Sequence, residues 1–338
     1  MNLQEFLNKP IQVGGKEIEN RLFLAPMAAL GHIALREMIL EYGGCGILFM
    51  EMCNAKAVPH ENRHISTTFK WRDEELDKLV CQLFGSEPEA MAKAAQRLEA
   101  ENFFGVDLNF GCSVSSICNK NYGAALLKDP KLAAEIVAAV SAAVNIPVFA
   151  KFRTGWSSDP GPAVDLAKRF EDAGADALVF HPRVAPDRRG RPPKLDHIKL
   201  VKEAVSIPVF GNGNVFDEES AVKMIEATGC DGLSIGRAAI AKPWIFSELI
   251  SGKKQDDEIY YRHILRMTEL LEKHFPPVNA IRLFKKSAMY FAANFKFGHP
   301  LWAKLINAKT MEGIRDNIHE IFSKYNDVST KPNMNMFV

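Results

Sequence analysis

Four side chains able to do chemistry stand at the ends of apolar runs. Cys112 follows the run Gly105–Phe110, Lys151 and Arg153 close the run FAKFR, and His181 ends the run ALVFH. A thiol and an imidazole can exchange protons near neutral pH. A cation at the end of an apolar run is costly to bury unless it meets an anion or an electron-rich ring. These residues predict a site for such a ligand, with a structural ion pair as the alternative for the two cations.

An amide and two glycine-containing stretches extend the candidate site. Gln82 lies inside the apolar run VCQLFG, so its amide needs partners, which either a heteroaromatic cofactor with imide edges or the neighbouring backbone would supply. The stretches GNGN (211–214) and IGRAAIAKPWIF (235–246) each follow an apolar run. Glycine lets backbone N–H groups approach an anion, so both stretches predict phosphate binding, although simple tight turns are the alternative. Arg237, in the second stretch, could add a bidentate contact to the anion.

Eight short apolar runs alternate with amphipathic helical patterns as far as residue 250. The runs are Leu22–Met27, Gly46–Met52, Leu79–Phe84, Gly105–Phe110, Pro147–Phe152, Ala177–His181, Pro208–Gly211 and Gly232–Ile235. Nearly continuous apolar strands separated by helices indicate a parallel sheet that is covered on both faces. Eight such units predict a (β/α)₈ TIM barrel, an α/β fold whose active site lies at the carboxyl ends of the strands. A doubly wound open sheet is the competing layout.

The pattern changes after residue 250. The polar linker SGKKQDDE precedes two helical apolar stripes, which are separated by Pro276 and Pro277. We therefore expect three segments: a barrel in 1–250, a small all-α domain in 255–325 and a disordered tail in 326–338. Residues 251–338 contain 14 Lys and Arg against 9 Asp and Glu, whereas residues 1–250 contain 28 against 32. The helical part is thus a basic appendage on a slightly acidic body.

Composition excludes several classes of protein. No apolar run reaches the roughly 18 residues that a membrane helix needs, and the N-terminus does not resemble a signal peptide. We expect a cytoplasmic protein, and a monomer. The six cysteines form no CxxC pair and no usual zinc pattern. Neither a metal site nor a disulfide is therefore expected, and each cysteine other than Cys112 is predicted to be a buried thiol.

Two basic stretches favour a polyanionic substrate. In RLFKKSAMYF, helical spacing places Arg282, Lys285 and Lys286 on one face, opposite the apolar stripe. Such a face is often merely solvated, but it can also follow a phosphate backbone. HPRVAPDRRGRPPK adds a second basic group near the proposed barrel mouth. Its cations are Arg183, Arg188, Arg189, Arg191 and Lys194.

With these motifs in order, the sequence resembles the dihydrouridine synthases, flavin enzymes that reduce uridine in tRNA. The resemblance covers nearly the whole chain in both order and spacing. It rests on LAPMA (24–28), FMEM (49–52), QLFGSEPE (82–89), LNFGC (108–112), YGAALLKDP (122–130), AKFRTGW (150–156), HPR (181–183), IPVFGNGNV (207–215), DGLSIGRAAIAKPWIF (231–246) and FKKSAMYF (284–291).

The resemblance implies a role for each matching residue. Pro26 and Met27 would lie against the ring of FMN, which Gln82, Lys151 and His181 would also contact. The phosphate would be held by Asn212, Gly213, Gly236 and Arg237. Asn109 and Arg153 would bind the uracil, and Cys112 would be the catalytic acid. NADPH would reduce the flavin. The substrate would be tRNA, contacted by Arg183, Arg282, Lys285 and Lys286.

The sequence departs from the family pattern around the substrate. Ser113 stands where proline is usual, Val184 stands where threonine is common, and His197 follows Asp196 where tryptophan is frequent. Two other hypotheses therefore stay open. One is an FMN barrel that acts on a small molecule, resembling dihydroorotate dehydrogenases or ene-reductases. The other is a flavin-free RNA-binding barrel.

Overall fold

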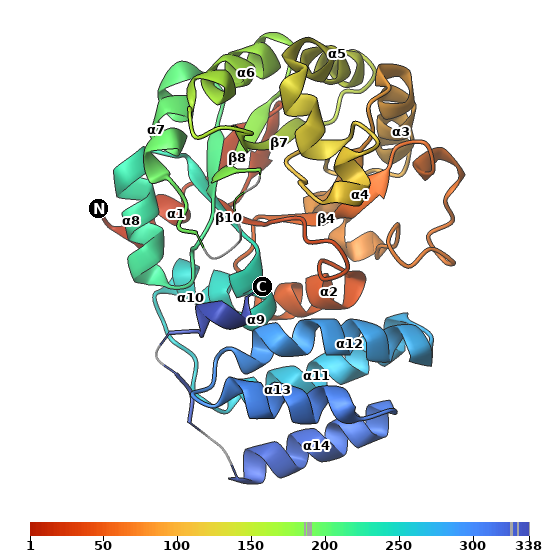
Figure 1. The fold of residues 1–338 in the computed structure, drawn as a ribbon, viewed down its shortest axis with the longest axis vertical. Helices are drawn as coiled ribbons and strands as arrows, with labels where there is room; N and C mark the ends of the chain where they lie inside the picture. Colours follow the sequence, from red (N-terminus) through yellow and green to blue (C-terminus); the bar gives the residue numbers. More distant parts are fainter. Residues whose placement is uncertain (186, 188–190, 325–326, 330, 338) are drawn as a thin grey trace.

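The computed structural model is a closed barrel of parallel strands with a layer of helices packed beneath it (Figure 1). It describes residues 1–338 except 186, 188–190, 325–326, 330 and 338. The strand order is β10-β3-β4-β5-β6-β7-β8-β9, and the pairing of β10 with β3 closes the ring. The predicted TIM barrel is confirmed, and its closure excludes the doubly wound alternative.

All eight predicted strands are present. They are β3 (Leu22–Leu24), β4 (Ile47–Asn54), β5 (Leu79–Phe84), β6 (Gly105–Phe110), β7 (Val148–Gly155), β8 (Ala177–Val184), β9 (Val209–Asn212) and β10 (Gly232–Ile235). The ends differ from the prediction in β3, β4, β7, β8 and β9, by one or two residues in β4 and β9 and by more in the other three. β3 stops before Pro26, which has no N–H to donate to a neighbouring strand. β7 and β8 run on through Arg153 and Arg183, which extends the barrel wall towards the mouth.

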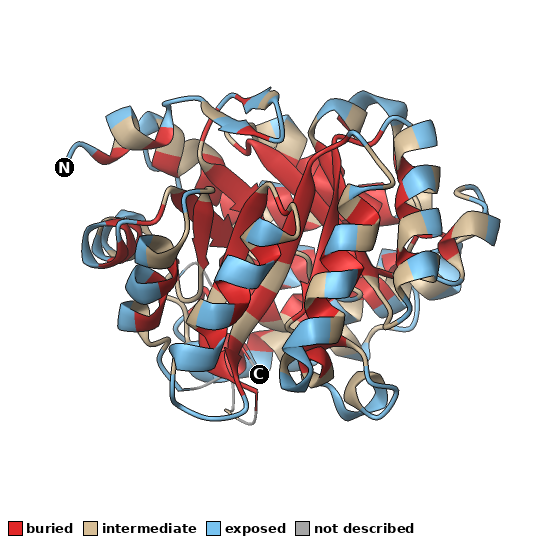
Figure 2. Cartoon of the chain, turned by 90° about the horizontal axis from the view of Figure 1, so that it is seen from above, coloured by how far each residue is buried: buried red, intermediate tan, exposed pale blue. Residues whose placement is uncertain are grey.

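Helices cover the outside of the barrel. They are α1 (Leu3–Leu7), α2 (Ile33–Tyr42), α3 (Pro88–Ala100), α4 (Ser115–Cys118), α5 (Pro130–Ser141), α6 (Gly161–Asp172), α7 (Leu195–Ala204), α8 (Glu218–Thr228), α9 (Arg237–Ala241) and α10 (Ile245–Ser251). Short 3₁₀ turns are η1 (Val58–His60), η2 (Asp73–Lys78) and η3 (Gly123–Lys128). Asp129 and Asp217 cap α5 and α8 by accepting backbone N–H bonds, which fixes where these helices begin. Figure 2 shows the result: buried strands inside, and helices exposed on their outer faces.

The barrel interior has an aromatic floor. Phe23, Phe49, Phe149 and Phe210 point inward from four strands, and the rings of Phe23 and Phe210 stack with centroids 3.8 Å apart. A hairpin of β1 (Ile11–Val13) and β2 (Lys16–Ile18) adds its apolar side chains to the same cluster. Since side chains alternate along a strand, the residue two positions after each floor residue also points inward, one layer higher.

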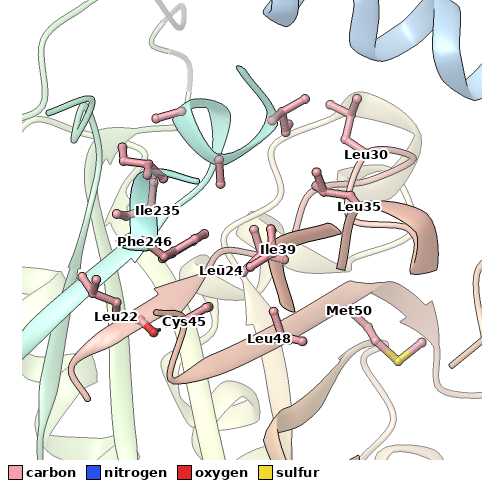
Figure 3. Close-up of a cluster of buried hydrophobic side chains, with 14 of the residues drawn as sticks. Leu22, Leu24, Leu30, Leu35, Ile39, Cys45, Leu48, Met50, Ile235 and Phe246 are labelled. Atoms are coloured by element: carbon pink, nitrogen blue, oxygen red, sulfur yellow. Dashed lines mark hydrogen bonds between the residues drawn. The ribbon is translucent and has the colours of Figure 1, made fainter. Parts of the chain in front are cut away.

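The alternate residues of the same strands face outward. Leu22, Leu24 and Leu48 pack with Leu35 and Ile39 of α2 in a separate apolar cluster (Figure 3). This cluster continues between the strands and the surrounding helices. Each strand is therefore buried on both faces, which explains the nearly continuous apolar runs of the sequence.

Four helices follow the barrel: α11 (Ile259–His274), α12 (Pro277–Ala292), α13 (Gly298–Asn307) and α14 (Met311–Lys324). Phe275 and Pro276 separate α11 from α12, and Pro277 is the first residue of α12, so the break lies at the prolines as predicted. α12 is the helix of this layer that lies beside α9 and the barrel mouth (Figure 1). Glu37 of α2 joins the two parts by an ion pair with Lys273 and a hydrogen bond with His274 of α11. In the described part of the chain, no helix combines the length and hydropathy needed to cross a membrane.

The predicted disordered tail is wrong for Met336 and Phe337. Met336, in the 3₁₀ turn η4 (Met334–Met336), and Phe337 are each 1% exposed. The Phe337 ring packs against Phe216 and Tyr290, with centroids 5.6 Å away in both cases. The polar composition of the segment hid two apolar side chains, and only the folded barrel and α12 provide the surface that buries them.

A fully buried ion pair fixes the loop after β3. Arg36 of α2 and Glu75 of η2 are each 0% exposed, and Arg36 Nη2 lies 2.8 Å from Glu75 Oε1. Arg36 also donates to the carbonyls of Gly31 and Lys70. One guanidinium therefore ties the loop that carries Pro26 and Met27 to the segment that precedes β5.

We expect Arg36→Met to lower the free energy of unfolding by about 3–5 kcal/mol, because the buried Glu75 carboxylate loses the cation that contacts it at 2.8 Å and keeps Arg72, whose Nη2 lies 4.0 Å away. Urea denaturation measures the change. The matched control is Arg266→Met, which removes a half-exposed arginine paired with Glu41 and Glu269. The control should change stability by less than about 1 kcal/mol. Equal effects of the two substitutions would contradict the structural role of Arg36.

Candidate active site

A cavity of about 660 Å³ opens at the carboxyl ends of the barrel strands. All of the site residues predicted from the sequence line it except Arg282 and Lys285. They come from every part of the barrel wall, and α12 adds Lys286, Met289 and Tyr290. The cavity is therefore bounded by the barrel on one side and by the C-terminal helices on the other.

A chain of amides forms the layer above the aromatic floor. Gln82 Nε2 donates to Asp107 Oδ2 at 2.6 Å, and Asn109 Nδ2 donates to Gln82 Oε1 at 2.7 Å. Asn109 Oδ1 in turn accepts from the backbone N–H groups of Gly111 and Cys112. Strand register brings these residues together, since Gln82 of β5 lies opposite Asp107 of β6. The chain of hydrogen bonds links the buried layer to the loop that carries the thiol.

Sequence reasoning missed Asp107. The available signal was a carboxylate inside an apolar run, two residues before Asn109, so that both side chains share one face. The side chain is fully buried, and its Oδ1 has no hydrogen-bond partner among the described residues. Burial raises the pKa of Asp107 to about 7.

Lys151 occupies the same layer on β7. Its Nζ donates to Asn212 Oδ1 at 3.0 Å, and Asn212 Nδ2 donates to the carbonyl of Ser234 at 2.6 Å. Burial lowers the pKa of Lys151 to about 8, and the negative charge of Asp107 opposes that fall. The ammonium group therefore titrates close to the physiological range, where a change in its surroundings alters its charge.

His181 is a neutral imidazole. Burial, followed by the cationic groups of Lys151, Arg153 and Arg183, holds its pKa well below the usual value. Arg183 Nη1 lies 3.2 Å from His181 Nε2. A guanidinium can only donate, so Nε2 accepts and Nδ1 carries the proton. The imidazole can thus offer one defined N–H to a ligand.

The other end of the cavity is suited to an anion. Asn214 Oδ1 accepts from Arg183 Nη2 and from Arg237 Nη2, each at 3.0 Å, so one amide holds two guanidinium groups together. Gly213 has φ +141°, and a Cβ there would lie 3.4 Å from the His181 ring. A Cβ on Gly236 would lie 3.1 Å from the Met27 sulfur. The glycines therefore keep this end open, and Asn214 is a functional candidate that the sequence analysis quoted only as part of GNGN.

Cys112 sits at the edge of the cavity on a constrained loop. Its N–H donates to Asn109 Oδ1 at 3.0 Å, and its carbonyl accepts from Ala124 at 2.8 Å. Gly123 has φ +61°, and a Cβ there would approach the Cys112 carbonyl to 2.6 Å, so only glycine fits. The thiol is half-exposed, whereas Cys45, Cys53, Cys81 and Cys230 are buried as predicted. Cys118 is also half-exposed, which corrects the prediction of a buried thiol.

A second carboxylate missed from the sequence supports the loop after β3. Glu51 is 5% exposed and accepts a hydrogen bond from the backbone N–H of Ala29. Burial raises the pKa of Glu51 to about 6. Ala29 has φ +56°, an uncommon conformation for a residue with a side chain. Glu51 therefore holds the bend that presents Pro26 and Met27 to the cavity.

The basic residues are only partly gathered at the site. Arg282 and Lys286 of α12 are exposed and Lys285 is half-buried, and Lys286 Nζ donates to the carbonyl of Ala28. Arg183 is 4% exposed and lies inside the cavity wall. Arg191 pairs with Asp187 at its rim. Arg188 and Arg189 lie outside the described residues. Within those residues, no cluster of His, Cys, Asp and Glu could hold a metal ion.

Comparison with solved structures first gives the fold class of the protein. The solved structures that match include the old yellow enzyme of Trypanosoma cruzi, with TM-score 0.56 and 12% identity over 75% of this chain and 93% of that one. A 2-naphthoyl-CoA reductase matches with TM-score 0.56 and 15% identity over 74% of this chain and 53% of that one. At these identities the likeness is one of fold, and it places the chain among TIM-barrel proteins.

Sequence comparison then gives the family. The family model described as dihydrouridine synthase (Dus) matches residues 23–318. tRNA-dihydrouridine synthase B of Pseudomonas syringae pv. tomato is 33% identical, over 93% of this chain and 95% of its own. The enzyme of the same name in Pseudomonas aeruginosa is 40% identical, over 71% of each chain. The chain belongs to the dihydrouridine synthase family, which confirms the resemblance.

We expect Gly213→Ala to weaken binding of FMN by about tenfold, because a side chain at φ +141° would strain the backbone and its Cβ would lie 3.3 Å from Pro193 Cβ. Titration of the apoprotein with FMN, followed by flavin fluorescence, measures this. Gly229→Ala is the control. Gly229 lies at the end of α8 and has φ +66°, with open space around the position of a Cβ. Both substitutions carry a similar backbone cost of about 1 kcal/mol. Unchanged FMN binding by Gly213→Ala would show that this glycine does not border the cofactor.

Proposed function

We propose that this protein reduces uridine to 5,6-dihydrouridine in tRNA, with FMN as cofactor, NADPH as reductant and Cys112 as proton donor. The observation that carries the proposal is the position of the Cys112 thiol, on the edge of one cavity whose wall contains both a polar layer and an anion-binding end. Membership of the dihydrouridine synthase family supports the reaction.

The described residues fit FMN. The hydroxyl of Ser234, which lines the cavity, is buried and has no partner among the described residues, so a ligand with a polar edge would satisfy it. Gln82, Lys151 and His181 would contact the ring, with the backbone of Pro26 and Met27 along it. The phosphate would be held by Asn212, Gly213, Gly236 and Arg237. When bound and reduced, FMN supplies the hydride for carbon 6 of the uracil.

The residues of the chain would perform the remaining work. Asn109 and Arg153 would orient the uracil. The Arg153 guanidinium would also stabilise the negative charge that develops on a carbonyl oxygen of the uracil. The Cys112 thiol would donate its proton to carbon 5, becoming a thiolate that regains a proton from solvent. A thiol positioned beside the reacting carbon can serve as the general acid of this step. The target base would have to leave its stack to enter the cavity.

The burial and hydrogen bonds of Arg183 favour a different role from the RNA contact that the sequence predicts for it. Its guanidinium is buried, shares Asn214 with Arg237 and donates to the carbonyl of Arg191. We place it with the groups that hold the cofactor phosphate rather than with those that meet RNA.

The cations of α12 favour tRNA as substrate. Lys286 lines the cavity, and helical spacing places the exposed Arg282 and the half-buried Lys285 beside it, within a segment of net charge +5. A small substrate would need no such surface, whereas a folded RNA has phosphates on either side of the target base. We propose that residues 255–325 act as the RNA-binding part of the chain. A monomer in the cytoplasm would suffice, since one chain supplies the whole cavity.

Cys112→Ala should abolish dihydrouridine formation while leaving bound flavin, since it removes the proton donor but no proposed FMN contact. Nucleoside mass analysis of tRNA incubated with the variant and NADPH measures the product, and the flavin absorbance of the purified protein reports the cofactor. Cys118→Ser is the control. This variant should retain activity, because Cys118 lies on the neighbouring helix α4. Full activity of Cys112→Ala would remove the thiol from the mechanism.

Replacing Arg282, Lys285 and Lys286 together by alanine should raise the KM for tRNA and reduce the salt dependence of binding, by about one unit of slope for each phosphate that is no longer neutralised. Reduction of the bound flavin by NADPH should be unchanged. The control replaces three exposed cations on the outer helices α5 and α6, Lys131, Lys168 and Arg169. Equal tRNA affinity of the two triple variants would favour a small-molecule substrate.

A further inference from the structure

We propose that Asp107 is a positioning residue for the flavin site: its carboxylate sets the orientation of the Gln82 amide, and its charge keeps Lys151 in the ammonium form. The inference rests on the proposed function, because it gives both residues a task towards FMN. Asp107 itself does not line the cavity, so it would act through its neighbours.

The orientation of Gln82 follows from the two hydrogen bonds that hold it. A carboxylate only accepts, so the amide nitrogen of Gln82 must face Asp107, and its oxygen then accepts from Asn109. An amide nitrogen carries two hydrogens, and one of them remains for a ligand in the cavity. Gln82 is thereby fixed as a donor towards the flavin ring, with its own oxygen already occupied.

The effect on Lys151 is one of charge. The strand β6 pairs with β7 so that Asn109 lies opposite Lys151 and Asp107 lies opposite Phe149. Asp107 therefore lies level with Phe149 of the aromatic floor, two residues below the position that is opposite Lys151. In this dry environment the carboxylate raises the pKa of Lys151 against the effect of burial, and Lys151 lowers the pKa of Asp107 in return.

Other charged groups face Lys151 and act in the opposite direction or weakly. Arg153 on the same strand lowers the pKa of Lys151, whereas Cys112 above it raises that pKa. His181 on β8 is neutral. Asn212 on β9 is uncharged and accepts a hydrogen bond from Lys151. Asp107 is the carboxylate among these groups, so the ammonium form depends mainly on it.

A purely structural role does not explain a charged residue here. An asparagine would have the same shape and could accept the bond from Gln82, without the cost of burying a carboxylate. Asp107 is fully buried and one of its oxygens has no partner in the described structure. A buried carboxylate at this position costs free energy that an asparagine would not, so its presence favours a role for Asp107 that requires a negative charge. A cation beside the ring stabilises negative charge that builds on the ring during reduction.

The test compares Asp107→Asn with the wild type over pH 7 to 10. In the wild type, the affinity for FMN and the kcat/KM for tRNA should both fall as pH rises through about 8, where Lys151 loses its proton. Removing the carboxylate should move both profiles to lower pH by about one unit, so that kcat/KM at pH 9 is about tenfold lower. The melting temperature should be unchanged or higher, since a buried charge has been removed.

Two controls separate this role from a general one. Asp176→Asn changes another carboxylate whose pKa is raised by burial, but Asp176 bonds the backbone of Val148 at the opposite end of the barrel. Its profiles should match those of the wild type. In a Lys151→Met background, Asp107→Asn should shift no pH profile, because the group through which it acts is absent.

The outcomes are distinct. If the wild type binds FMN and forms dihydrouridine, but Asp107→Asn has the same pH profiles and FMN affinity, the inference is wrong and the proposed function stands. A wild-type FMN affinity that does not change between pH 7 and 10 would also overturn the inference without any variant. If the wild type binds no FMN, the proposed function fails and the inference fails with it.

Discussion

The aromatic floor of the barrel is the constraint on which the site depends. Phe23, Phe49, Phe149 and Phe210 fill the lower interior and shut out water from below. Every polar side chain in the next layer must therefore find its partners beside it or above it. Gln82 of β5 bonds Asp107 on the adjacent strand β6, and Lys151 of β7 reaches past β8 to bond Asn212 of β9. The layer is consequently a set of rigid, paired groups that leaves its remaining hydrogen-bonding capacity directed into the cavity.

The same floor sets the electrostatics of the site. Removing water disfavours charge, which lowers the pKa of Lys151 and His181 and raises that of Asp107. The cavity wall and the buried residue beneath it thus bring together a neutral imidazole, Lys151 with a pKa of about 8 and Asp107 with a pKa of about 7. Groups of this kind change protonation state with small changes in their surroundings, which is the condition that acid–base and redox chemistry on a bound ligand requires.

The mouth of the barrel is completed from the far end of the chain. Tyr290 of α12 lines the cavity and packs against Phe337, whose carbonyl accepts from Arg237 Nη1 at 3.0 Å. The C-terminal segment thereby reaches the end of the cavity that suits an anion. On the other side of the mouth, the buried Arg36–Glu75 pair holds the loop after β3. The cavity is thus as dependent on helix packing outside the barrel as on the strands themselves.

The sequence alone determined the barrel and most of its mouth. Apolar runs marked the strands, their period of two placed Lys151 and Arg153 on one face, and their ends indicated where Cys112 and His181 would lie. The glycines of GNGN and IGR, which also follow the ends of apolar runs, indicated the end of the mouth that is suited to an anion. These features are local, since strand alternation and glycine conformation depend on near neighbours in the chain.

Only the tertiary structure decided which side chains are paired. Asp107 meets Gln82, and Asn214 joins Arg183 to Arg237, because strand register and loop geometry bring them together. The burial of Phe337 depends likewise on Phe216 and Tyr290, which are distant in the sequence. A sequence pattern states the face on which a residue lies but not the register of the strand beside it. The pairing that sets the charge of each group therefore appears only when the barrel closes.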